Sequence, residues 1–311
     1  MAHRKNDIRR TQIDGHTILE CIDSETDHSF SVIPDYGGSL NSFVCKGEEV
    51  LLGARNEKDF QEFTVNSYAG AQLFPYPNRI KGGNYTFDGE EFSLPLNDHP
   101  YKNALHGLIY NRPFKVVDIA ASHGRVKLEY RYQHDHGGYP FDLLLSNTYR
   151  LSGNTLSIYT VIENLGSDTA PVGHGWHPYF MAPEKADVYS LEMEQQGYYV
   201  IDHDLIPTGE LVDTFIASDL KPIGSTELNH CFALEKGKAS KVKLINSING
   251  REVEISTKGY PYMQVYIPPN RNCIALEPCT CIPNAFNNQV GSRYLEPSEV
   301  WELQFDITIK A

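Results

Sequence analysis

The sequence predicts an all-β protein, a large antiparallel β-sandwich. Alternation of apolar and polar residues recurs along the 311-residue chain, and turn-favouring dipeptides separate many of the alternating runs. We recognise no amphipathic helix of ordinary length with its own caps, and the 24 glycines and 18 prolines are spread as turn punctuation. Strands at such regular spacing favour broad antiparallel sheets packed face to face.

The alternation is clearest near the C-terminus. Residues 300–310 place apolar side chains on one face of an extended segment and polar side chains on the other, which predicts a half-buried strand. The apolar residues are Trp301, Leu303, Phe305, Ile307 and Ile309.

Three hairpins are predicted from their turn residues, because such short turns reverse a strand tightly. They are residues 85–94 around Asp88-Gly89, residues 241–255 around Asn249-Gly250, and residues 143–163 around Ser152-Gly153-Asn154.

The composition limits the partners and the number of domains. With 41% hydrophobic residues the chain can bury a large core. The nearest candidate for a linker, residues 213–229, is only mildly polar, so we expect a single domain over residues 1–311. The formal charge of −13 repels phosphate backbones and anionic membrane surfaces, which argues against nucleic-acid and membrane partners.

The N-terminus and the cysteines predict the location and the redox state. A polar run through His16 stands where a secretory signal would place its apolar stretch, and no segment is apolar over the length of a bilayer. We therefore expect a cytoplasmic protein, either a monomer or a homodimer. The six cysteines lack the spacing of a zinc site and are expected to be reduced thiols: Cys21, Cys45, Cys231, Cys273, Cys279 and Cys281.

Residues 171–180 are the strongest candidate for a ligand site. They contain two imidazoles, three aromatic residues and two glycines. Trp176 and Tyr179 offer flat faces that suit a sugar, and His177 is a side chain that exchanges protons near neutral pH. The alternative is a buried turn whose histidines only satisfy backbone groups.

Three other polar residues stand at strand ends or in turns. Arg79 can present its planar guanidinium to hydroxyls or a carboxylate, and His106 lies at a bend ended by Gly107. Glu277 ends a short apolar strand, where partial desolvation favours proton acceptance. The structural alternatives are a surface arginine, a turn histidine and a glutamate that leaves the sheet for water. Both His177 and Glu277 precede a proline, which restricts their backbones to extended geometry.

Together these motifs resemble the aldose 1-epimerases, also called galactose mutarotases, from about residue 78 through residue 284. The motifs that carry the resemblance are Asn78-Arg79-Ile80, Leu105-His106-Gly107, Gly138-Tyr139-Pro140, His177-Pro178-Tyr179-Phe180 and Leu276-Glu277-Pro278. Each motif is short, but their order and spacing together are specific.

The resemblance implies a galactose mutarotase-like supersandwich fold and a role for each site residue. His177 is expected to be the general acid, Glu277 the general base, and His106 a second contact at the ring. Asn78 and Arg79 are expected to bind the sugar.

One position departs from the family pattern. Where many members have Asp before His-x-Phe, this chain has Asn229 before His230-Cys231-Phe232. Asn offers one acceptor oxygen and two donor hydrogens, whereas Asp accepts only. Asn229 is still expected to bind a hydroxyl, but the preferred aldose is left open.

Anomer exchange needs two proton movements, one at the C1 hydroxyl and one at the ring oxygen, and neither requires a cofactor or a metal. We therefore expect a monosaccharide as the partner and no cofactor. The other functions considered are a hexose-phosphate mutarotase, with cations from Arg271, Arg293 or Lys102, and a sugar-binding protein without turnover.

Two further enzyme classes fit the sequence less well. A glycoside hydrolase needs two facing carboxyl groups, and Asp142, Glu163 and Asp187 do not stand in such a constellation. A metal enzyme would need three ligands, and neither the histidines of residues 134–136 nor His174 with His177 have an evident third ligand.

Overall fold

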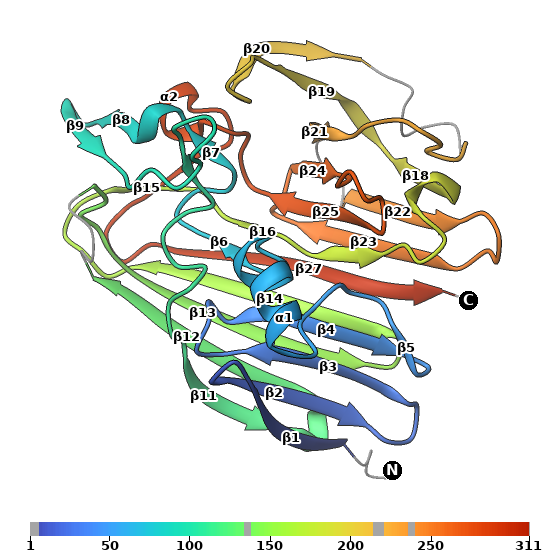
Figure 1. Cartoon of the computed structure of the whole chain (residues 1–311). Helices are drawn as coiled ribbons and strands as arrows, with labels where there is room; N and C mark the ends of the chain where they lie inside the picture. Colours follow the sequence, from blue (N-terminus) through green and yellow to red (C-terminus); the bar gives the residue numbers. More distant parts are fainter. Residues whose placement is uncertain (1–5, 134–137, 214–220, 236–239, 311) are drawn as a thin grey trace.

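The computed structural model describes residues 6–133, 138–213, 221–235 and 240–310, and it is built almost entirely from antiparallel strands (Figure 1). One of two eight-stranded sheets contains the C-terminal strand β27 near its middle, and we call it the first sheet. In order across the sheet the strands are β11 (Lys115–Ala120), β12 (Arg125–Gln133), β13 (Asp142–Ser152), β14 (Thr155–Asn164), β27 (Val300–Lys310), β23 (Glu252–Lys258), β22 (Ser240–Asn246) and β18 (Tyr189–Met193).

A second sheet of eight strands carries most of the candidate site residues. Its order is β20 (Pro207–Val212), β19 (Gln195–Ile201), β21 (Asn229–Leu234), β24 (Tyr262–Tyr266), β25 (Cys273–Cys279), β16 (Gly175–Trp176) and β6 (Gln72–Leu73), and β17 (Tyr179–Met181) also pairs with β25.

The N-terminal sheet extends this second layer. It contains β1 (Asn6–Ile13), β2 (His16–Asp23), β3 (His28–Ile33), β4 (Ser39–Cys45) and β5 (Glu48–Glu49). Just beyond β5, Leu52 N donates to Tyr179 O at 2.8 Å and Met181 N donates to Val50 O at 2.9 Å. These hydrogen bonds join the chain after β5 to β17.

The N-terminal sheet and the second sheet both pack against the first sheet, the one that contains β27. Phe30 of β3 stacks on Tyr149 of β13 with ring centroids 6.3 Å apart, and Trp176 of β16 lies 5.9 Å from Phe305 of β27. One cluster of buried side chains extends from Leu19 to Ile309. The result is the sandwich that the sequence predicts.

The remaining elements are short. Three pairs of strands stand apart from the large sheets: β7 (Arg79–Ile80) with β10 (Ala104–Leu105), β8 (Asn84–Phe87) with β9 (Glu90–Ser93), and β15 (Ala170–Val172) with β26 (Arg293–Leu295). The helical segments of the described chain are α1 (Glu57–Asp59), η1 (Phe60–Val65), η2 (Lys81–Gly83), η3 (Ala121–His123), η4 (Ala186–Val188) and α2 (Ala285–Asn288).

The strand predictions are confirmed. Strand β27 covers the predicted residues 300–310 and buries Trp301, Leu303, Phe305, Ile307 and Ile309. The three predicted hairpins are the pairs β8–β9, β22–β23 and β13–β14. All six cysteines are buried and unbridged. Within the described ranges, no helix is both long and apolar enough to cross a membrane.

Candidate active site

One cavity of about 430 Å³ brings together residues that lie far apart in the sequence. Seven of the eight predicted site residues line it: Asn78, Arg79, His106, His177, Tyr179, Asn229 and Glu277. The eighth, Trp176, lies elsewhere.

The floor of the cavity is a face of the second sheet. Glu277 of β25 pairs across the strands with Gln264 of β24, and Asn229 at the start of β21 pairs with Tyr266. Residues directly opposite each other in antiparallel strands point to the same face, and so do residues two apart along one strand. Glu277, Gln264, Tyr266 and Asn229 therefore share one face.

Backbone hydrogen bonds hold His177 between β16 and β17. Its N donates to Ala71 O at 3.0 Å, and its carbonyl accepts from Gly70 N at 2.8 Å. Its ring stacks on Tyr179 with centroids 4.8 Å apart. The imidazole is thus fixed in orientation from both its backbone and its ring.

The pair β7–β10 supplies the opposite wall. Arg79 of β7 pairs with Leu105 of β10, and His106 follows directly with a φ of 61°. Its N donates to Asn78 O at 2.8 Å. Gly107 is required next because a Cβ there would lie 2.1 Å from Phe74 O, a contact that no side chain tolerates.

His177 and Glu277 form the centre of the cavity. His177 Nε2 lies 3.5 Å from Glu277 Oε1, and the two residues are only 5% and 2% exposed. The ring of His106 stands nearly perpendicular to that of His177, with centroids 5.1 Å apart. At this centre, three buried polar atoms have no hydrogen-bond partner among the described residues: His106 Nδ1, His177 Nδ1 and Glu277 Oε2. Such atoms are costly unless a ligand or water satisfies them.

Burial shifts the protonation of this centre. Desolvation lowers the pKa of His177 to about 4 and holds the pKa of His106 well below its usual value. Desolvation also raises the pKa of Glu277 well above its usual value, although the charge of Arg79 opposes this shift. Burial therefore disfavours the charged forms of both groups, the His177 imidazolium and the Glu277 carboxylate. Transfer of one proton from a Glu277 carboxyl group to the His177 imidazole would create an ion pair at this distance.

Arg79 is held by the predicted site residue Asn78 and by two residues that the sequence did not point to, Asp98 and Tyr101. Its Nε donates to Asp98 Oδ2 at 2.7 Å, and Asp98 is only 7% exposed. Its NH1 donates to Asn78 Oδ1 at 3.3 Å, and its guanidinium lies 5.5 Å from the centre of the Tyr101 ring. Asp98 lies in a polar loop, so no local pattern distinguishes it from a surface residue.

Asn229 is also engaged by a residue that sequence reasoning missed. Gln264 Nε2 donates to Asn229 Oδ1 at 2.9 Å, which leaves the Asn229 amide hydrogens available. The signal for Gln264 was the alternation of residues 262–266, which places Tyr262, Gln264 and Tyr266 on one face.

Comparison with known proteins shows the family to which the chain belongs. The family model for aldose 1-epimerase matches residues 20–308. The chain belongs to the aldose 1-epimerase family. It is 30% identical over 250 residues to YihR, an uncharacterized protein of Escherichia coli, and the match covers 78% of this chain and 79% of YihR. It is also 30% identical over 245 residues to the galactose mutarotase of Sus scrofa, covering 71% of this chain and 68% of that protein.

Solved structures show the same fold. A galactose mutarotase-like protein from Clostridium acetobutylicum superimposes with a TM-score of 0.86 at 21% identity, and 98% of each chain is covered. A galactose 1-epimerase from Lactobacillus acidophilus superimposes with a TM-score of 0.82 at 19% identity, again over 98% of each chain. The all-β supersandwich expected from the resemblance is therefore confirmed.

The expectation that Trp176 stacks on a sugar needs correction. Within this epimerase-family fold Trp176 is fully buried between the layers, where it contacts Tyr149 and Phe305. Its position in β16 points it away from the cavity that its neighbour His177 lines. The indole is thus part of the core, and only Tyr179 remains as the predicted aromatic wall.

His174 is likewise structural. It is fully buried, with Gln72 Nε2 2.7 Å from its Nε2 and the Tyr260 hydroxyl 3.1 Å from its Nδ1. It is not a second ligand beside His177, because both of its ring nitrogens are already engaged. The other histidines considered for a metal, in residues 134–136, lie outside the described residues.

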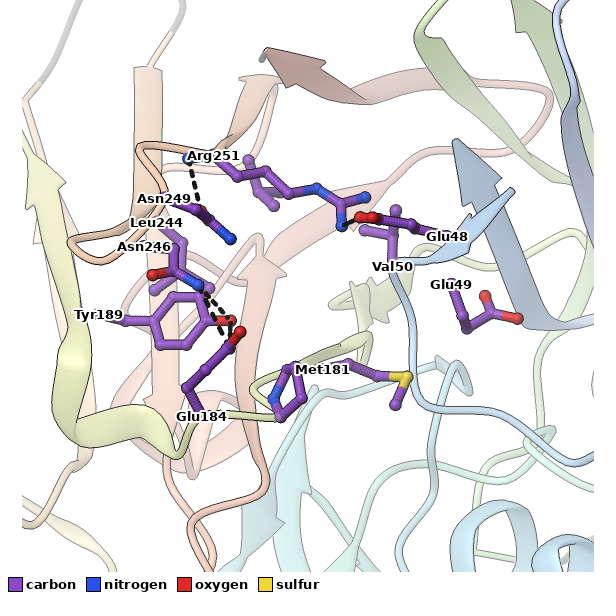
Figure 2. Close-up of a pocket in the computed structure, with 12 residues that line it drawn as sticks. Glu48, Glu49, Val50, Met181, Glu184, Tyr189, Leu244, Asn246, Asn249 and Arg251 are labelled. Atoms are coloured by element: carbon purple, nitrogen blue, oxygen red, sulfur yellow. Dashed lines mark hydrogen bonds and ion pairs between the residues drawn. The ribbon is translucent and has the colours of Figure 1, made fainter. Parts of the chain in front are cut away.

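A second cavity of about 350 Å³ lies between β5 and the β22–β23 hairpin (Figure 2). Asn246 Nδ2 donates to Glu184 Oε2 and to the Tyr189 hydroxyl, both at 3.3 Å, and Arg251 pairs with Glu48. These polar side chains satisfy one another. This cavity shares no lining residue with the candidate active site.

Proposed function

We propose that the protein is an aldose 1-epimerase that interconverts the α and β anomers of a free hexose. The contact that supports this proposal is the 3.5 Å approach of His177 Nε2 to Glu277 Oε1 inside a cavity. The C1 hydroxyl and the ring oxygen are both bonded to C1. The group that takes one proton and the group that gives the other must therefore lie close together, as these two do.

The proposed reaction begins with His177 protonated and Glu277 ionised. Glu277, as the carboxylate, takes the proton of the C1 hydroxyl while the His177 imidazolium donates to the ring oxygen, so the C1–ring oxygen bond breaks. The product is an open-chain aldehyde, with the carboxyl group protonated and the imidazole neutral. Rotation about C1–C2 exposes the other carbonyl face, and the reverse proton transfers close the ring as the opposite anomer.

Burial, which raises the pKa of Glu277 and lowers the pKa of His177, opposes the charged forms of both groups. Hydroxyl groups of a bound sugar replace water with fixed dipoles and supply hydrogen bonds to both charged groups. Sugar binding is therefore expected to favour the ion pair. This coupling uses substrate binding to prepare the acid and the base together.

The remaining residues orient the sugar. His106 Nδ1 lacks a partner among the described residues, and we assign it a contact with the ring side of the sugar. Asp98 accepts a hydrogen bond from Arg79, and Gln264 donates one to Asn229. These bonds hold both side chains in one orientation, so their remaining donors are already directed before the sugar binds. Tyr179 supplies an apolar face in the cavity wall.

The cavity supports a free hexose better than a hexose phosphate. Among the described residues, Arg79 is the one lysine or arginine that lines it. Arg271 pairs with Asp187, Arg293 pairs with Glu299 at 2.6 Å, and Lys102 does not line the cavity. None of the three cations considered from the sequence therefore reaches the cavity as a phosphate ligand.

Polarimetry on freshly dissolved α-anomers tests the proposal. Free glucose and galactose should equilibrate faster with the protein than without it, while glucose 6-phosphate and galactose 6-phosphate should gain little. If only the phosphorylated sugars equilibrated faster, the protein would be a hexose-phosphate mutarotase instead. No acceleration with any sugar, together with saturable sugar binding, would support a binding protein without turnover.

A further inference from the structure

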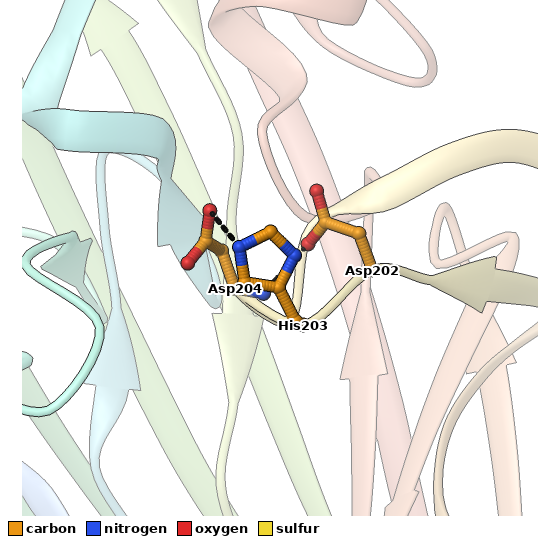
Figure 3. A group of neighbouring side chains, drawn as sticks. All are labelled: Asp202, His203 and Asp204. Atoms are coloured by element: carbon orange, nitrogen blue, oxygen red, sulfur yellow. Dashed lines mark hydrogen bonds and ion pairs between the residues drawn. The ribbon is translucent and has the colours of Figure 1, made fainter.

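The tip of the β19–β20 hairpin is a tightly hydrogen-bonded turn (Figure 3). Asp202 Oδ1 accepts from Asp204 N at 2.9 Å and from Ile206 N at 3.0 Å, and Asp202 N donates to Ile206 O at 2.8 Å. Leu205 has a φ of 62°, a conformation that a branched side chain rarely adopts. The turn therefore fixes the direction of the Leu205 side chain.

Leu205 lines the candidate active-site cavity. It comes from the edge of the second sheet, beyond β21, whereas Arg79 and His106 come from the separate pair β7–β10. An apolar side chain in this position makes no hydrogen bond to a sugar. Its contribution is contact area and the exclusion of larger groups.

The side chain of Asn103 links the hairpin to the wall that carries Arg79. Asn103 is 1% exposed, its Nδ2 donates to Asp204 O at 3.1 Å, and its Oδ1 accepts from Gly82 N at 3.0 Å. Its backbone carbonyl accepts from Asp98 N at 3.1 Å. One buried residue therefore contacts the hairpin tip, the turn that follows Arg79, and the carboxylate residue that holds Arg79.

A second contact between the hairpin tip and the turn that follows Arg79 is weaker. Lys81 Nζ lies 3.7 Å from Asp202 Oδ2, and the Lys81 side chain is 55% exposed. Ion pairs of this kind contribute little because water and salt screen them. The buried amide of Asn103 is the stronger attachment.

We propose that Asn103 is a positioning residue that anchors the hairpin tip, and that Leu205, held there, limits the size of the sugar the cavity accepts. The inference rests on the proposed mutarotase function and deepens it. Leu205 admits a free hexose and disfavours a reducing sugar with a second ring.

Leu205→Ala tests the size limit. The variant should accept freshly dissolved α-lactose better relative to α-glucose, and we expect the ratio of kcat/KM for lactose to that for glucose to rise about tenfold. With glucose, KM should rise while kcat stays within about twofold, because the contact is equally present in the ground and transition states. An unchanged ratio would show that Leu205 does not limit size.

Asn103→Asp tests the anchor. The carboxylate still accepts from Gly82 N but repels the Asp204 carbonyl, so the tip should detach. The ratio of kcat/KM for lactose to that for glucose should rise. The double variant Asn103→Asp with Leu205→Ala should raise this ratio no more than the larger of the two single changes, because both changes act on one contact. The anchoring role would be overturned if kcat fell equally for both sugars, or if the two single changes had additive effects on this ratio in the double variant.

Hydrogen exchange separates this inference from the mutarotase proposal. Amide exchange over residues 201–207 should be faster in Asn103→Asp than in the wild-type protein, whether or not the protein turns over sugar. His203→Ala is the matched control, because its side chain is 88% exposed at the same tip, and it should change neither the exchange nor the ratio. Unchanged exchange in folded Asn103→Asp would refute the anchor, whereas wild-type inactivity on every sugar would refute the mutarotase proposal alone.

Discussion

His174 and His177 lie within one turn-and-strand segment, and both are buried, yet their surroundings differ. The ring nitrogens of His174 contact Gln72 and Tyr260, whereas His177 Nδ1 has no partner among the described residues and Nε2 faces Glu277. Burial lowers the pKa of both, to about 3 and about 4. Burial alone therefore does not mark a catalytic histidine. The unpartnered Nδ1 atom and the acidic neighbour distinguish His177, the proposed general acid, from His174.

Glu277→Gln should have the largest effect on the rate, because it removes the acidic neighbour that distinguishes His177 from His174. The amide cannot accept the C1 proton, and loss of a positioned base costs about 10²–10⁴-fold in rate. Polarimetry with a free α-hexose measures the loss, and circular dichroism checks the fold. Wild-type rates in the folded variant would remove Glu277 from the mechanism.

The two histidines should respond differently to replacement by glutamine. His177→Gln should lose about 10²–10⁴-fold in rate while keeping most of its stability. His174→Gln should instead lower the free energy of unfolding by about 1–3 kcal/mol, because buried partners lose their hydrogen bonds. The folded fraction should keep a rate near wild type. Urea unfolding and polarimetry on the same samples measure both quantities, and equal rate losses would contradict the distinction.

Asp98→Asn should have a smaller effect than either catalytic change. Arg79 would lose its charged partner at 2.7 Å and with it a fixed orientation. We expect KM for the free hexose to rise about tenfold with a modest change in kcat, because hydrogen bonds to charged groups are worth about 1.5–3 kcal/mol. Lys81→Ala, a change at an exposed cation nearby, is the control. A fall in kcat at unchanged KM would place Asp98 in the proton transfers instead.

The pH dependence of stability concerns folding rather than turnover. A histidine with a lowered folded pKa takes up its proton more readily in the unfolded state, so acidification favours unfolding. The free energy of unfolding should therefore fall as the pH decreases from about 6.5 toward 3, through the contributions of His174 and His177. His174→Gln should reduce this slope in urea titrations at several pH values. An unchanged slope would mean that His174 is not held neutral by burial.

The sequence was sufficient for the fold because its signals are local. Alternation in residues 300–310 and turn dipeptides such as Asn249-Gly250 determine strands and hairpins without information from distant residues. Short motifs likewise pointed to Arg79, His106 and Glu277.

Contacts between distant segments were beyond the reach of sequence reasoning. Trp176 was misplaced because an aromatic residue beside His177 can face either the cavity or the core, and only sheet packing decides between them. Asp98 and Gln264 were missed because their partners, Arg79 and Asn229, lie 19 and 35 residues away. Asn103 acts on Asp204 at a separation of 101 residues, which no local pattern encodes.

Exchange spectroscopy by NMR on an equilibrium mixture of free hexose anomers tests the central claim most directly, because it observes α and β interconversion without a change in concentration. The wild-type protein should produce exchange between the two anomeric protons at rates well above the buffer, and Glu277→Gln should return the exchange to the buffer rate. Equal exchange with both proteins, or none with either, would contradict the claim that the His177–Glu277 pair opens and closes the sugar ring.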